Sequence, residues 1–175
     1  MRITSFTAAL LLATASSAQD DIVERYGCTL ATAIYRQPTT DWVLRFHPVD
    51  RENSAPNQRN AFTIEVPGGK IIEGGVWIPN GFTIALGGMD FDCPEELRGI
   101  SDPPPEHPGC NLWSGTVYGD GPQGIGELVE ETSPPPLQVL FPEFAVGLWY
   151  GLSIPGFEPR DMIPLDAFTF AGCAK

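Results

Sequence analysis

Short runs of residues in which every second position is apolar recur along the chain. The clearest run covers residues 41–47, where Trp42, Leu44 and Phe46 occupy alternate positions. Successive side chains of a strand point to opposite faces, so this spacing predicts a strand with one buried face. We expect these three side chains to lie together in a core.

Similar runs continue to the end of the sequence. They predict further strands at 28–35, 61–66, 70–73, 76–78, 82–86, 112–118, 137–141, 146–152 and 168–173, and the pattern allows another at 124–130. Turn signals separate them, notably Pro67-Gly68-Gly69 and Asn80-Gly81. We therefore predict an all-β chain of about 8–10 short strands, folded as an antiparallel meander barrel or sandwich. A short N-terminal helix or turn within residues 20–35 is the one expected exception.

The first 18 residues have the three parts of a secretory signal. Arg2 is positive, residues 6–15 are mostly apolar, and Ser16-Ser17-Ala18 offers small residues for cleavage before Gln19. The apolar stretch is too short for a stable transmembrane helix. We therefore predict a signal peptide at 1–18 and one exported domain at 19–175, without a membrane anchor. The simple signal favours a bacterial protein that is periplasmic or secreted.

Four cysteines form an even set, and export makes disulfides the default. Three pairings are possible. We favour Cys93–Cys110, which closes a local, proline-rich loop, and Cys28–Cys173, which joins the first mature segment to the last. No two cysteines have the short spacing that zinc sites prefer.

The charge of the chain limits its partners. It has 10 Lys and Arg against 22 Asp and Glu, a net charge of −12. Such a surface repels phosphate backbones and anionic lipids, so we expect neither nucleic acid nor membrane as a partner. A protein or a small neutral or cationic ligand remains compatible with this charge.

The loop between Cys93 and Cys110 is the first candidate binding element. A covalently closed, proline-stiffened loop loses less entropy when it binds. Its candidate binding residues are Glu95, Glu96, Arg98, Asp102, Glu106 and His107. A stapled surface insertion without a partner explains the same residues.

Carboxylates near the start of that loop suggest two further chemistries. Asp90 and Asp92 would share one face of an extended segment, and calcium prefers such oxygen ligands. The spacing lacks the glycine and final glutamate of a calcium loop, so this metal site is a weak candidate. Asp92 with Glu95 is a candidate acid–base pair for hydrolysis.

The four tryptophans are candidate ligand contacts. Trp42, Trp77, Trp113 and Trp149 each fall within a predicted strand. Indole rings can stack sugars or apolar ligands, and core packing explains them equally well. An aromatic-lined barrel interior would suit a small-ligand carrier.

No sequence motif assigns catalysis. His47 and His107 are the only histidines, and no Gly-x-Ser-x-Gly or phosphate-loop sequence is present. We predict an exported, non-catalytic binding or accessory domain without a cofactor, which binds a protein through the Cys93–Cys110 loop. A carrier and a carboxylate-dependent hydrolase are the alternatives.

Overall fold

A computed structural model of the chain describes residues 27–81, 84–98, 104, 106–107, 109–121, 123–151 and 163–175. Their regular secondary structure is nearly all β, as predicted, and the strands form one ten-stranded sheet. The predicted signal peptide lies outside the described residues. Within the described part, no helix is long and apolar enough to span a membrane.

The elements follow one another along the chain as short segments. The strands are β1 (Ala33–Arg36), β2 (Val43–His47), β3 (Gln58–Val66), β4 (Lys70–Trp77), β5 (Leu86–Asp90), β6 (Trp113–Thr116), β7 (Tyr118–Gly121), β8 (Gly124–Glu127), β9 (Gln138–Leu140) and β10 (Ala167–Cys173). The helical turns are η1 (Leu30–Thr32) and η2 (Glu95–Leu97), and α2 (Phe144–Gly151) is a short helix.

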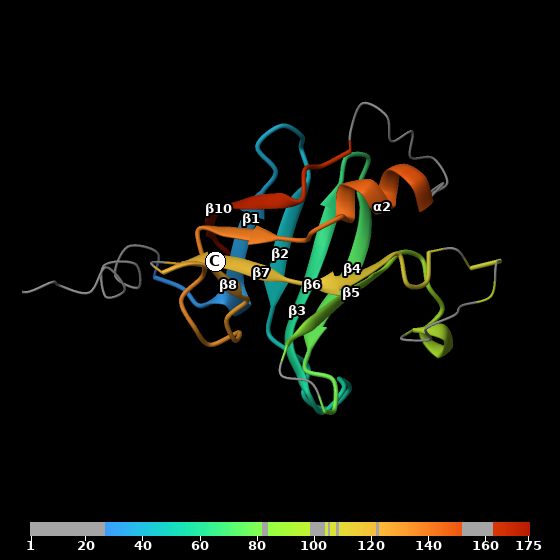
Figure 1. Cartoon of the computed structure of the whole chain (residues 1–175), viewed down its shortest axis with the longest axis horizontal. Helices are drawn as coiled ribbons and strands as arrows, with labels where there is room; N and C mark the ends of the chain where they lie inside the picture. Colours follow the sequence, from blue (N-terminus) through green and yellow to red (C-terminus); the bar gives the residue numbers. More distant parts are fainter. Residues whose placement is uncertain are drawn as a thin grey trace, which may run out of the picture.

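The sheet is a nearly closed antiparallel barrel. Strands β1 to β6 form a meander, because each pairs with the next along the chain. On the other edge of β1 the order continues with β10, β9, β7 and β8. Only Val117 separates β6 from β7, so one bent segment pairs with β5 at its start and β9 at its end. In Figure 1 this segment crosses in front of β2 to β5 and curls the sheet around its core.

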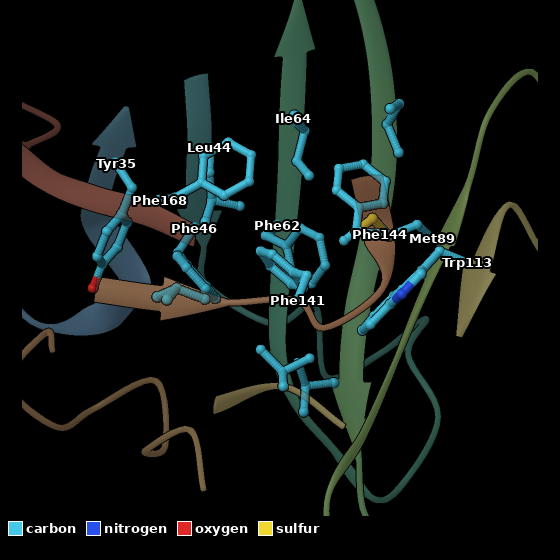
Figure 2. Close-up of a cluster of buried hydrophobic side chains, with 14 of the residues drawn as sticks. Tyr35, Leu44, Phe46, Phe62, Ile64, Met89, Trp113, Phe141, Phe144 and Phe168 are labelled. Carbon is cyan, nitrogen blue, oxygen red and sulfur yellow. The ribbon is translucent and has the colours of Figure 1, made fainter. Parts of the chain in front are cut away.

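Aromatic rings fill the barrel. The ring of Phe141 lies at the centre, with centroids 5.3 Å from Phe62, 5.5 Å from Trp113 and 5.9 Å from Phe168 (Figure 2). The planes of the pairs with Trp113 and Phe168 are nearly perpendicular, at 89° and 85°, a geometry that the ring quadrupoles favour. The interior is thus occupied by side chains.

The alternation that predicted β2 is confirmed. Trp42, Leu44 and Phe46 are all buried in the core. Trp42 precedes the first residue of the strand, and its ring packs edge-on against Phe144 at 6.0 Å between centroids.

The structure contains both predicted disulfides. Cys28 pairs with Cys173, which ties the chain before η1 to the end of β10. Cys93 pairs with Cys110 and closes the excursion between β5 and β6. Disulfides are typical of proteins in an oxidising environment.

The prediction of a strand at 82–86 is wrong in its position. Residues 82 and 83 lie outside the described part, and β5 begins only at Leu86. Gly87 and Gly88 belong to this strand, and neighbouring large side chains occupy the space that their own side chains would fill. A Cβ on Gly87 would lie 2.4 Å from Val117 on the core side, and one on Gly88 would lie 2.5 Å from Trp77.

A glycine pair also misled the prediction for β4, which is one strand rather than two. Gly74 faces Phe62 of β3, and a Cβ there would lie 2.3 Å from that ring. The glycine thus makes room for a core aromatic while the strand continues through it.

The predicted strand at 146–152 is wrong, because residues 144–151 form α2. The carboxylate of Asp166 accepts hydrogen bonds from the N–H groups of Glu143 and Ala145, both at 2.9 Å, at the start of the helix. Phe144 and Leu148, one turn apart, are both buried. An apolar run alone does not distinguish a strand from a helix.

The segment expected to be a short helix or turn followed by a strand from residue 28 begins, in its described part, with η1. Strand β1 begins at Ala33, five residues later than predicted. Leu30 N–H donates to Ser133 O at 2.8 Å, so η1 is held by a distant segment that sequence spacing does not reveal.

Candidate ligand groove

A hollow of about 510 Å³ lies on the outer face of the sheet, over strands β3 to β6. The strand register places a row of small residues across its middle. Gly75 of β4 faces Gly88 of β5, which in turn faces Ser114 of β6. Because the two glycines carry no side chain, the sheet surface dips between the neighbouring rows.

Two side chains lie over this glycine row. A Cβ on Gly88 would lie 2.5 Å from Cη2 of Trp77, and a Cβ on Gly75 would lie 2.8 Å from Nε2 of Gln58. Each glycine is therefore required for the side chain above it to lie where it does. Trp77 is half-buried and lines the hollow, so part of its indole remains accessible.

Carboxylates form the opposite wall. Glu73 of β4 and Asp90 of β5 are direct cross-strand partners. Like charges at facing positions destabilise a sheet. Arg98 forms an ion pair with Glu73, and Oδ1 of Asp90 accepts a hydrogen bond from Asn111 N–H at 2.6 Å. These two contacts offset the repulsion and leave Oδ2 of Asp90 without a donor among the described residues.

The base of the disulfide-closed loop belongs to this wall. Phe91 N–H donates to Gly109 O at 2.8 Å, and the Cys93–Cys110 bond follows, so the two stems of the loop are held together. Arg98 extends from the loop to Glu73. The loop that the sequence singled out therefore borders the groove through Arg98.

A second hollow of about 340 Å³ adjoins the first. Glu73 and Arg98 line both, so their ion pair separates the two. Here the ammonium of Lys70 lies 5.6 Å from the ring centroid of Phe91, a cation–π contact.

A third hollow, of about 300 Å³, lies at the start of β3. Its charges neutralise one another: Arg59 lies 3.7 Å from Glu130 and 3.9 Å from Glu127, and Arg51 pairs with Glu131. Glu131 also accepts a hydrogen bond from Val49 N–H at 2.8 Å. These contacts attach the segment after β8 to the start of β3, which is a structural role.

The four candidate tryptophans have three different environments. Trp42 and Trp113 are core residues, and Nε1 of Trp113 donates to Pro142 O at 3.0 Å. Trp149 is 51% exposed on α2, not on a strand as predicted. Only Trp77 lines the groove.

The candidate loop residues are dispersed. Glu95 and Glu96 are exposed on η2, and Glu106 is exposed on the returning part of the loop. His107 N–H donates to Pro104 O at 2.9 Å within a turn. Asp102 lies outside the described residues. Of the described members of this set, Arg98 is the one that lines the groove.

The weak metal candidates are separated. Asp90 lines the groove, whereas Asp92, whose φ of 49° turns the chain, lines the adjoining hollow. No three His, Cys, Asp or Glu side chains converge on a metal site within the described residues. Of the candidate hydrolytic pair, Asp92 lines this adjoining hollow and Glu95 does not.

Shifted pKa values occur at groups away from the groove. Burial, with a smaller effect of Asp120, raises the pKa of Tyr35, whose hydroxyl donates to Pro136 O at 3.0 Å inside the barrel. Burial and the nearby Arg45 lower the pKa of His47, whose ring lies 2.8 Å from the Thr63 hydroxyl.

Sequence reasoning missed most of the groove. Its unpredicted residues include Gln58, Glu73, Gly75, Gly88, Asn111 and Ser114. Two glycine pairs, Gly74-Gly75 and Gly87-Gly88, were the available sequence signal for a hollow, since each lies among the apolar residues of a strand. Their significance depends on cross-strand register, which the pattern of a single strand does not give.

Comparison with known proteins gives no relative for this chain: no family model, no curated protein and no solved structure matches it.

Proposed function

We propose that the protein is an exported, non-catalytic binding module whose ligand site is the groove lined by Trp77. The observation that carries this proposal is the position of Trp77, which lies over Gly88 in a hollow walled by polar side chains. Binding sites combine a concave apolar surface with a few polar groups that fix the orientation of the ligand. The groove has both components.

Unused hydrogen-bonding capacity supports this site. In the described part of the chain, no residue hydrogen-bonds to the Ser114 hydroxyl, to Oε1 of Gln58 or to Oδ2 of Asp90. All three residues line the groove. A ligand with both donors and acceptors can use these atoms without displacing a protein contact.

The groove also joins two of the sequence-based hypotheses. Trp77 is one of the candidate aromatic contacts, and Arg98 belongs to the candidate binding loop. The barrel interior, which a small-ligand carrier would need, is filled by rings such as Phe62 and Phe141. We therefore favour the outer groove over the interior.

Blocking the groove tests the proposal. Ser114 is exposed on β6, and Ser114→Tyr places a ring in the hollow at a position where a strand tolerates an aromatic residue. The matched control is Thr169→Tyr, at an exposed position of β10. The ¹⁵N amide spectra of the wild type and both variants are recorded while a mixed library of neutral saccharides, quaternary and primary amines and short apolar amides is added.

We expect at least one compound to shift the Trp77 indole N–H together with the Gly88 and Ser114 amides. The Thr169→Tyr variant should bind that compound as the wild type does, and the Ser114→Tyr variant should lose it. A library that leaves these signals unchanged, or shifts signals elsewhere on the barrel, contradicts the proposal.

Export is tested separately on the protein isolated from its source. Mass spectrometry should find a mature N-terminus at Gln19 and four oxidised cysteines. An intact Met1 would contradict export and the periplasmic or secreted location that we propose.

A further inference from the structure

We propose that the ligand of this groove is a neutral saccharide, with one sugar ring stacked on Trp77 and its hydroxyls bound by the opposite wall. This inference rests on the proposed function, because it names the ligand class of the same site.

The aromatic surface suits a sugar ring. One face of a pyranose presents C–H groups with partial positive charge, and the face of an indole is negative. Trp77 is held in place, since its six-membered ring lies over Gly88 and the adjacent Ile78 N–H donates to Asn57 O at 3.2 Å. A ring that is already ordered loses little conformational freedom when it binds.

The polar wall suits the hydroxyls of a sugar. A hydroxyl donates one hydrogen bond and accepts others, so it needs both kinds of partner nearby. Asp90 offers an acceptor, Arg98 offers donors, and Ser114 offers both. The carboxylate and the guanidinium are planar groups that can engage two adjacent hydroxyls at once.

Charge and solvation disfavour other ligand classes. Two carboxylates and one guanidinium line the groove, in a chain of net charge −12, so an anion is repelled. A wholly apolar ligand would remove water from Asp90 without replacing its hydrogen bonds. Asp90 would attract a cation, but the cation would also lie close to the positive charge of Arg98, which repels it.

The size of the groove limits the length of the ligand. A hollow of about 510 Å³ lies within the range of small-molecule sites. We expect one or two sugar units in contact, with longer chains leaving the groove along the row that ends at Ser114.

The test uses the full mature protein and a panel of neutral mono- and disaccharides built from glucose, galactose, mannose or N-acetylglucosamine. Choline and arginine ethyl ester serve as cationic probes. Binding is followed through the Trp77 indole N–H signal and by calorimetry. The variants are Trp77→Ala, Trp77→Phe and Asp90→Asn, with Trp149→Ala as the matched control, since Trp149 lies on α2.

We expect a saccharide to bind the wild type and Trp149→Ala equally. Trp77→Ala should weaken binding by about tenfold, as the loss of one aromatic contact predicts, and Trp77→Phe should weaken it less. Asp90→Asn should weaken saccharide binding severalfold, while its amide spectrum shows that the variant is still folded.

Two results would overturn the inference, and they differ in what else they overturn. If the cationic probes shift Trp77 and no saccharide does, the site binds ligands but the sugar assignment fails. If no probe of either class shifts Trp77, the proposed function fails with it.

Discussion

The indole ring of Trp77 lies over the backbone of Gly88, so that a Cβ at Gly88 would come within 2.5 Å of the ring. Trp77 belongs to β4 and Gly88 to β5, and the facing partner of Gly88 on β4 is Gly75. The tryptophan therefore leans diagonally across a strand pair onto a position that only glycine can provide. Both residues line the groove.

Gly74 also leaves space for an aromatic ring, but on the core side of β4. Gly74→Ala would place a Cβ 2.3 Å from the buried ring of Phe62 and 2.9 Å from Gly88 O. We expect it to lower the free energy of unfolding by about 1–3 kcal/mol, the usual range for overpacking a core. Gly126→Ala is the control, because a Cβ there meets nothing within 4 Å. Urea unfolding of both variants checks this, and equal stability would contradict it.

The capping of α2 by Asp166 gives a second prediction. Asp166→Ala removes the acceptors for the N–H groups of Glu143 and Ala145. We expect a loss of about 1–2 kcal/mol in the free energy of unfolding, as for other helix caps. Hydrogen exchange should show earlier opening of residues 144–149. Asp41→Ala, at an exposed carboxylate, is the control, and unchanged exchange in the Asp166 variant would contradict the capping role.

The two disulfides should differ in how much they stabilise the fold. Their sequence separations are 145 for Cys28–Cys173 and 17 for Cys93–Cys110. Loop-closure entropy then predicts losses of about 5 and about 3 kcal/mol on replacing each pair with alanine. Denaturant unfolding under non-reducing conditions measures both. A larger loss from the Cys93–Cys110 pair would show that the loop stabilises the fold by more than chain entropy.

His47 should make stability depend on pH. Burial and Arg45 lower its pKa in the folded state below the ordinary value of 6.5, so the unfolded chain binds the proton more tightly. Stability should therefore be full above about pH 6.5 and fall as the pH drops towards the folded pKa. His47→Gln should reduce this fall, as measured by urea unfolding at pH 7.5 and pH 5.5. An identical pH dependence in the variant would contradict the assignment.

The sequence predicted the elements that depend on local pattern. The alternation around Leu44 identified β2, and the even set of cysteines in a chain with a signal-like start predicted disulfides. Of the three possible pairings, the short, proline-rich loop favoured the one that the structure contains. The strand could be predicted because the two-residue period of a strand is a pattern of consecutive residues.

The sequence did not predict what depends on contacts between distant segments. Gly87 and Gly88 resemble a turn until Val117 and Trp77 are placed on either side of them. The start of α2 depends on Asp166, which comes well after the end of the helix in the sequence. The groove joins residues from four strands, β3 to β6, and a loop, so its composition follows from register rather than from any local motif.

The most direct test of the ligand groove is a crystal structure of the protein with the best-binding saccharide from the panel. We predict a sugar ring stacked on Trp77, with hydroxyls within hydrogen-bonding distance of Asp90 and Ser114. Density for the sugar at another surface, with the Trp77 groove holding only solvent, would contradict the account.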